Sequence, residues 1–131
     1  MKLSFKLMDG EKTLLEMVVD EWSIHGLHQP VKLDECLDEV ATLHRVLANA
    51  TRVKMLCHLA EARECRFSDM IRRMRVNRKI LNDHLKTMCK EGLISRIRFN
   101  PRNVSYQPSR KGVMALLMCM LMANLFEKGN L

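Results

Sequence analysis

The stretch "NRKILNDHLKTMCKEGLI", residues 77–94, decides the fold because its spacing predicts one strongly amphipathic helix. Leu81, Leu85 and Met88 repeat at spacings of four and three, so they share a face that we expect to pack on a core. The opposite face carries polar side chains of a different kind, which are Arg78, Lys79, Asn82, Asp83 and Lys86. The pattern predicts a helix with one apolar side and one basic, amide-bearing side.

The positive charge of the chain is concentrated around this helix. The 131 residues contain 22 Lys and Arg against 15 Asp and Glu, which gives a net charge of +7. Residues 63–111 hold fourteen Lys and Arg against four acidic residues, whereas residues 1–62 carry a net charge of −3. A basic surface of this kind favours an anionic partner, while a merely solvated surface usually mixes both signs.

Two helices are predicted before this basic region. We expect Asp34 to cap the first, whose inward residues at helical spacing are Leu37, Val40, Ala41, His44 and Leu47. Asn49 or Thr51 is expected to cap the second, whose inward residues are Val53, Leu56, His58 and Leu59.

A short helix and a tight turn are predicted before residues 77–91. Cys65 to Phe67 is expected to be extended, and Ser68 to cap a helix with Met70, Ile71 and Met74 on one side. Residues 75–77 form the turn, Asn77 caps the next helix, and Gly92 ends it in the left-handed conformation.

Two strands and a last helix complete the predicted domain. The strands are Leu93 to Phe99 and Val104 to Gln107, around a turn at residues 100–103. Pro108 stops the second strand, and Ser109 caps a helix over residues 109–127. This order predicts a mainly α (α+β) fold, a winged helix-turn-helix with a two-strand wing, over residues 31–131.

The first thirty residues form a separate amino-terminal arm in this interpretation. Apolar and polar residues alternate on both sides of Asp9-Gly10, which is a strong hairpin signal. A helix over residues 13–22 is the alternative, since Leu14, Val18 and Trp22 lie four apart. Gly26 to Pro30 is expected to link the arm to the main domain.

The basic residues on and around the helix predicted over residues 77–91 predict an interface for double-stranded DNA. Arg, Lys and Asn are the side chains that reach phosphates and base edges from a helix in the major groove. The candidate DNA-binding residues are Arg72, Arg73, Arg75, Asn77, Arg78, Lys79, Asn82, Asp83, Lys86, Arg96, Arg98 and Arg102. A winged-helix module that binds a protein or RNA is the alternative interpretation.

Three segments carry a family resemblance. "LANATRVKMLCHLAE" (47–61) resembles the start of the second helix in arsenic-repressor-type (ArsR/SmtB-like) winged-helix regulators. "NRKILNDHLKTMCKEGLI" is similar to that family's recognition helix, with its Ser-x-His-Leu pattern, and "YQPSRKG" (106–112) is similar to the junction before the last helix. The resemblance covers residues 34–125. It implies a homodimeric repressor that binds a pseudo-palindromic operator and releases it on an intracellular signal.

The chain departs from the family at the known metal sites. The metal-sensing branch carries Glu-Leu-Cys-Val-Cys-Asp where this chain has "ECRFSD" (64–69), with Arg66 and Ser68 at the thiolate positions. A second family site needs His residues on the last helix, but His84 is the last His of the chain. We therefore expect neither a metal nor another cofactor, and "HGLH" (25–28) is interpreted as linker.

The five cysteines show no paired spacing, so a disulfide framework is not expected. Cys36, Cys57 and Cys89 lie at apolar helix faces, where packing and thiol sensing are both open. Cys65 lies beside Arg63 and Arg66, so it is the candidate for a lowered thiol pKa and a redox response. A small-molecule effector is the alternative signal.

The last helix predicts a homodimer. Val113 to Ala123 is apolar at all eleven positions, so it is apolar all the way round, yet too short for the roughly 20 residues that span a bilayer. The candidate dimerisation residues are Val113, Leu116, Leu117, Met120 and Leu121. Without a signal peptide, a Gly-rich phosphate loop or a catalytic triad, we expect a cytoplasmic protein that is not an enzyme.

Overall fold

The computed structural model describes residues 2–20, 23–28 and 32–127, with the backbone alone for residues 25–28. Contacts divide the chain into two compact units, Met1–Val40 and Ala41–Leu131. The domain boundary that we predicted at residue 30 stays a prediction, because the residues around it lie outside the described ranges.

The first unit contains a three-stranded antiparallel sheet in the order β1 (Lys2–Asp9), β2 (Lys12–Asp20) and β3 (Ser23–His28). Gly10 has a φ of +59° in the turn between β1 and β2, so the predicted hairpin is confirmed. The helical alternative for residues 13–22 is wrong, although its Trp22 lies outside the described residues.

The third strand was not predicted. Its last three residues, 26–28, belong to the segment that we interpreted as a linker, and Gly26 pairs with Met17 of β2 instead. Glycine is depleted in strands, so the sequence gives no local signal for this pairing.

A short 3-10 helix, η1 (Leu33–Cys36), precedes α1 (Leu37–Leu47). The predicted cap at Asp34 is wrong, because Asp34 lies inside the 3-10 helix and Lys32 occupies its N-cap position without a side-chain hydrogen bond.

The predicted inward face of α1 is also wrong in part. Leu37 is 54% exposed, and Ala41 and His44 are exposed as well. Val46 is the buried residue of this helix, and Leu47 packs beside it against the core. The apolar pattern did not identify Val46 because only the last turn of the helix meets the core.

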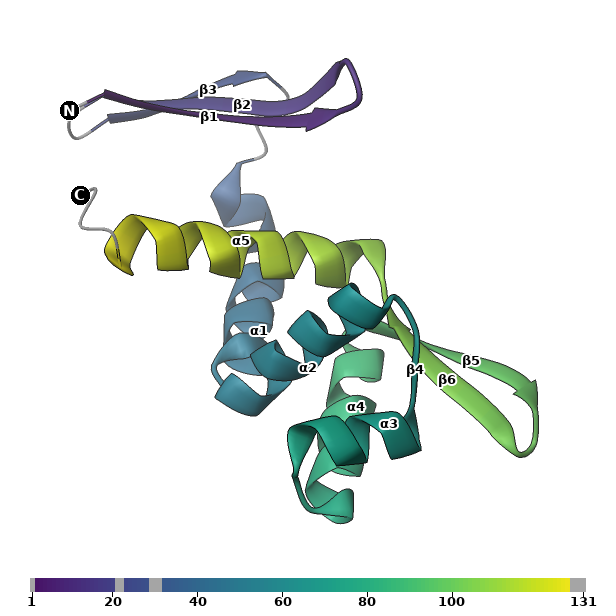
Figure 1. Ribbon diagram of the computed structural model, residues 1–131. Helices are drawn as coiled ribbons and strands as arrows, with labels where there is room; N and C mark the ends of the chain where they lie inside the picture. Colours follow the sequence, from purple (N-terminus) through teal and green to yellow (C-terminus); the bar gives the residue numbers. More distant parts are fainter. Residues whose placement is uncertain (1, 21–22, 29–31, 128–131) are drawn as a thin grey trace. The chain divides into compact units, whose positions relative to one another are not determined.

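The second unit has the predicted order of a winged helix-turn-helix (Figure 1). Its elements are α2 (Ala50–Ala62), β4 (Cys65–Arg66), α3 (Phe67–Met74), α4 (Arg78–Lys90), β5 (Ile94–Asn100), β6 (Asn103–Pro108) and α5 (Arg110–Glu127). The strands form a second sheet in the order β4-β6-β5. The wing of β5 and β6 extends away from the helices. The predicted mainly α (α+β) fold class is confirmed.

Three predicted helix starts are confirmed by side-chain caps. Asn49 Oδ1 accepts a hydrogen bond of 3.2 Å from the backbone N–H of Arg52, and Asn77 Oδ1 accepts one of 2.8 Å from Lys79. Ser109 Oγ accepts one of 3.0 Å from the N–H of Gly112. Such caps satisfy amides that the first turn of a helix leaves without a partner.

Gly92 ends α4 as predicted, with a φ of +75°. Its N–H donates to the carbonyl of Cys89 at 3.0 Å, and the N–H of Leu93 donates to that of Met88 at 2.9 Å. This is a Schellman motif, which turns the chain sharply from the helix into the wing.

The start of α3 differs from the prediction. The helix begins at Phe67 with Arg66 as its N-cap residue and no side-chain cap, so the predicted cap at Ser68 is wrong. The cause is a pairing distant in sequence, because Cys65 pairs with Tyr106 of β6 and the chain enters the helix directly from that strand.

The core lies between α2, α3, α4 and the start of α5. As predicted, it contains Leu56, Leu59, Met70, Met74, Leu81, Leu85 and Met88. Met55 is also fully buried, whereas the predicted Val53 and His58 are half-buried. The Nε2 atom of His58 is buried without a hydrogen-bond partner among the described residues.

Gly112 allows α5 to approach the end of α4. A Cβ at this position would lie 2.1 Å from the carbonyl oxygen of Leu93, which also accepts a hydrogen bond of 3.0 Å from the N–H of Ser109. A side chain cannot fit there without a shift of backbone atoms.

Candidate nucleic-acid interface

The turn between α3 and α4 is fixed by its backbone. Arg75 adopts the left-handed conformation with a φ of +53°, and its N–H donates to the carbonyl of Ile71 at 3.1 Å. Met74 on one side of the turn and Leu81 on the other are both buried in the core. The two helices therefore form a rigid helix-turn-helix.

The polar face of α4 is directed to solvent, as its spacing predicted. Arg78, Lys79, Asp83 and Lys86 are exposed, and Asn82 is half-buried beside them. Asn77 is also exposed, but its side-chain oxygen is engaged in the cap of the helix. The face offers cations and an amide, which are the groups that read phosphates and bases.

A shallow groove of about 620 Å³ lies at the amino-terminal end of this face, lined by Phe67, Asn77, Arg78, Lys79 and Asn82. The Arg78 guanidinium lies over the Phe67 ring, 5.4 Å from its centroid. This contact is a cation–π interaction that joins the start of α3 to the start of α4. Sequence analysis did not assign a role to Phe67.

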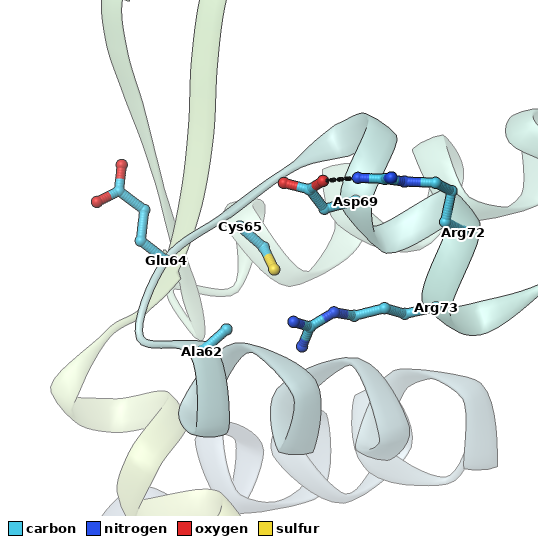
Figure 2. Close-up of a pocket in the computed structure, with 6 residues that line it drawn as sticks. All are labelled: Ala62, Glu64, Cys65, Asp69, Arg72 and Arg73. Carbon is cyan, nitrogen blue, oxygen red and sulfur yellow. Dashed lines mark hydrogen bonds and ion pairs between the residues drawn. The ribbon is translucent and has the colours of Figure 1, made fainter.

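Arg72 and Arg73 of α3 are exposed, and both line a pocket beside Cys65. Arg72 forms an ion pair with Asp69, and both line a pocket of about 650 Å³ together with Ala62, Glu64, Cys65 and Arg73. Figure 2 shows the Arg73 guanidinium directed toward the Cys65 thiol, while the Glu64 carboxylate points away. Glu64 instead accepts a hydrogen bond from Ser105 of β6.

The expectation of a lowered pKa for Cys65 is wrong. Its side chain is 5% exposed, and burial raises the pKa of the thiol, with Arg73 opposing and Asp69 adding to the increase. Loss of water around a buried thiolate outweighs the nearby positive charge. The redox role of Cys65 stays a prediction, without the physical basis that suggested it.

The wing presents three of the predicted arginines. Arg96 and Arg98 are exposed on the same face of β5, opposite Tyr106 and Val104 of β6. Arg102 is exposed at the tip, where its N–H donates to Asn100 Oδ1 at 3.0 Å and fixes the turn.

The orientation of α4 is held by a contact that sequence analysis missed. Arg52 of α2 donates from Nε to Nδ1 of His84 at 3.1 Å and from Nη1 to the carbonyl of Val46 at 3.1 Å. Burial and the Arg52 charge lower the pKa of His84, with Asp83 opposing, so its Nδ1 remains an acceptor. Arg52 thus joins α1, α2 and α4. We name this contact the Arg52–His84 clamp.

One free cysteine lies on α2 and another on α5. The thiols of Cys57 and Cys119 are half-buried and free. Burial raises the pKa of the Cys119 thiol, and interaction with the Cys57 thiol of α2 raises it further. The 61 residues between them conceal this interaction in the sequence.

The last helix has one buried side and a broad exposed apolar surface. Leu116 is 8% exposed and packs in the core, so its assignment to a dimer surface needs correction. Val113, Leu117 and Met120 are 40%, 48% and 53% exposed, and Leu121 is half-buried.

Within the described residues, no group of three or more His, Cys, Asp or Glu side chains could hold a metal ion. In the same part of the chain, no helix combines the length and hydropathy that crossing a membrane requires.

Comparison with known proteins agrees with this geometry. The family model "Bacterial regulatory protein, arsR family" matches residues 49–96, from the cap of α2 into β5. Residues 49–96 form an arsR-family domain. The predicted resemblance is thereby confirmed for these residues, and the family that they match is one of regulatory proteins rather than of enzymes.

Solved structures share the fold of this chain. Reduced HlyU from Vibrio cholerae is 22% identical, with a TM-score of 0.59 over 72% of this chain and 95% of its own. The homodimeric winged helix-turn-helix DNA-binding domain of Mb0332 from Mycobacterium bovis is 20% identical, with a TM-score of 0.62 over 75% and 90%. The transcriptional repressor BigR from Xylella fastidiosa is 19% identical, with a TM-score of 0.61 over 72% and 92%. No curated protein sequence matches the chain.

Proposed function

We propose that this arsR-family chain is a sequence-specific DNA-binding repressor that acts as a homodimer. The observation that carries the proposal is the exposed face of α4, where the Phe67-stacked Arg78 and half-buried Asn82 line one groove. Arg78 and Asn82 would read base edges in the major groove, while Lys86 and the arginines of α3 and the wing would contact phosphates or the minor groove.

Two binding measurements test this proposal. Duplexes selected from a random library by the purified protein should bind on the order of 10³-fold more weakly at 200 mM than at 50 mM salt, if about six phosphates are contacted. Asn82→Ala should weaken binding to the selected duplex by roughly 1 to 3 kcal/mol and leave random duplex almost unchanged. Equal losses on both duplexes would show that α4 does not read sequence.

A matched pair of lysines separates phosphate contact from general charge. Lys86 on α4 and Lys54 on α2 are both exposed. Lys86→Ala should reduce the salt dependence by about one phosphate contact, whereas Lys54→Ala should not. A preference for structured RNA, or no duplex binding, would favour the alternative module that binds RNA or protein.

The dimer is proposed to form through the exposed apolar side of α5. Val113, Leu117 and Met120 follow one another at helical spacing on this side. Pairing around a two-fold axis would bury them and could set two copies of α4 about 34 Å apart, one turn of DNA. Replacing Leu117 and Leu121 with Glu should give a folded monomer that has lost operator binding. A wild type that is monomeric at micromolar concentration would refute the dimer.

We also propose that a thiol signal would act through Cys57 and Cys119. Both are free cysteines, and their thiols interact across α2 and α5, whereas Cys65 is more deeply buried and faces Arg73. Hydrogen peroxide would take two electrons from the thiols and form one disulfide and two waters. Mass spectrometry should find that disulfide, and Cys57→Ser should abolish the loss of operator binding. Retention of the response in that variant, with loss in Cys65→Ser, would return the role to Cys65.

A further inference from the structure

The amino-terminal sheet has one face on which apolar side chains gather. In the register of β1 and β2, Leu3, Phe5 and Leu7 lie opposite Val19, Met17 and Leu15. Ile24 of β3 lies opposite Val19 and extends the same face. Side chains alternate between the two faces of a strand, so these seven residues share one side. We name this side the apolar sheet face.

The other side of the sheet has the opposite character. Lys2 pairs with Asp20, and Lys6 pairs with Glu16, so charged side chains of opposite sign lie across from one another. Val18, opposite Ser4, and Leu14 are apolar residues on this side of β2. The sheet is therefore a single layer whose charged residues gather on one side and whose apolar residues lie mostly on the other.

Among the described residues of its unit, the apolar sheet face is left without a buried side chain. None of its seven side chains is buried, and Leu3 and Ile24 are 37% and 65% exposed. A sheet that is apolar on one face is stable when that face packs against a second layer. This unit supplies no second strand layer among its described residues.

We propose that the apolar sheet face packs against the same face of a second copy of the chain within the homodimer. The proposal rests on the dimer proposed above. Two identical sheets can pack face to face about 10 Å apart around a two-fold axis. The face has no charge to repel its own copy, and β1 and β2 together with their turn carry three Lys against four acidic residues, which is close to neutral.

The size of the face fits a contact that is added to an existing dimer. Three strands about 4.8 Å apart and six residues long at about 3.4 Å each give a face of roughly 300 Å². A free-standing interface needs about 800 Å² per partner, so the sheets alone would not hold two chains together. Once the winged-helix domains are paired, the second sheet is present at about millimolar effective concentration, and a smaller face is sufficient.

Adjacent valines on β2 provide a matched test. Val19 lies on the apolar sheet face and Val18 on the other side, and both are half-buried. In the full chain, Val19→Lys should raise the monomer–dimer dissociation constant at least tenfold by sedimentation, while Val18→Lys should change it less than threefold. The change in chemistry is identical at the two positions.

The outcomes separate this inference from the proposed function. A monomeric wild type would refute the proposed dimer itself. If the wild type is dimeric and Val19→Lys leaves its monomer–dimer dissociation constant unchanged, only the sheet pairing is overturned. The face would then bind another part of its own chain or another protein. Isotope-filtered NOEs between methyl groups of Val19 and Leu15 from differently labelled copies should appear in the wild type, and their absence would refute the pairing without any variant.

Discussion

The Arg52–His84 clamp predicts that a conservative change outside the proposed DNA-binding face weakens both the fold and operator binding. The guanidinium of Arg52 donates to two acceptors, His84 Nδ1 and the Val46 carbonyl, each at 3.1 Å. A lysine has one ammonium group and lacks the planar fork, so Arg52→Lys can keep one of these hydrogen bonds at most.

The magnitude follows from the bond that is lost. A hydrogen bond to a charged group contributes about 1.5 to 3 kcal/mol, and the half-buried site places this one near the lower end, at about 2 kcal/mol. For a domain of this size, that loss lowers the melting temperature by about 10 °C. Because α4 loses a support to α2, binding to the selected duplex should also fall several-fold.

Urea unfolding of the wild type, Arg52→Lys and a control measures this effect. Arg45→Lys is a matched control, because Arg45 is exposed and its Nη2 donates to the hydroxyl of the nearby Thr42 at 3.3 Å. Its effect should remain within about 0.5 kcal/mol. If Arg52→Lys costs no more than Arg45→Lys, the clamp does not stabilise the helix-turn-helix and the reasoning is refuted.

Three further predictions concern the same domain. Phe67→Leu removes the ring beneath Arg78, so affinity for the selected duplex should fall about two- to fivefold in titrations while random duplex changes little. Gly112→Ala should lower the free energy of unfolding in urea by about 1 to 3 kcal/mol, because the new Cβ would meet the Leu93 carbonyl. The pKa of His84 is lowered on folding, so unfolding titrations should show its contribution complete above the ordinary value of 6.5 and lost as the pH falls below it. An equal pH dependence in His84→Gln would contradict this assignment.

The parts of the fold that were predictable depend on neighbouring residues. Asn77 caps α4 through an amide two residues away, and Gly92 ends it through bonds within one turn. The apolar spacing of Leu81, Leu85 and Met88 likewise identifies a face from one helix alone. Such signals are complete within a short window, which is why the sequence analysis located α4 and its polar face.

The parts that were missed depend on pairings between distant residues. Arg66 starts α3 because β4 pairs with β6, some forty residues later, and no local cap signal records this. The pKa of Cys65 was predicted from its neighbours in sequence, whereas burial by distant segments decides it. Interpretations that depend on burial therefore required the structure.

Pairings between distant residues also explain how α2 contributes to the candidate site. None of the residues that the sequence analysis predicted for the site lies on α2. Arg52 connects α2 to α4, the proposed recognition helix, and Cys57, five residues later, interacts with Cys119 of α5. A disulfide between Cys57 and Cys119 would draw α5 and α2 together. Because Arg52 is on the same rigid helix, a shift of α2 would be transmitted to His84 and to the orientation of α4. Through Arg52 and Cys57, α2 therefore interacts with both the proposed recognition helix α4 and the proposed dimer helix α5.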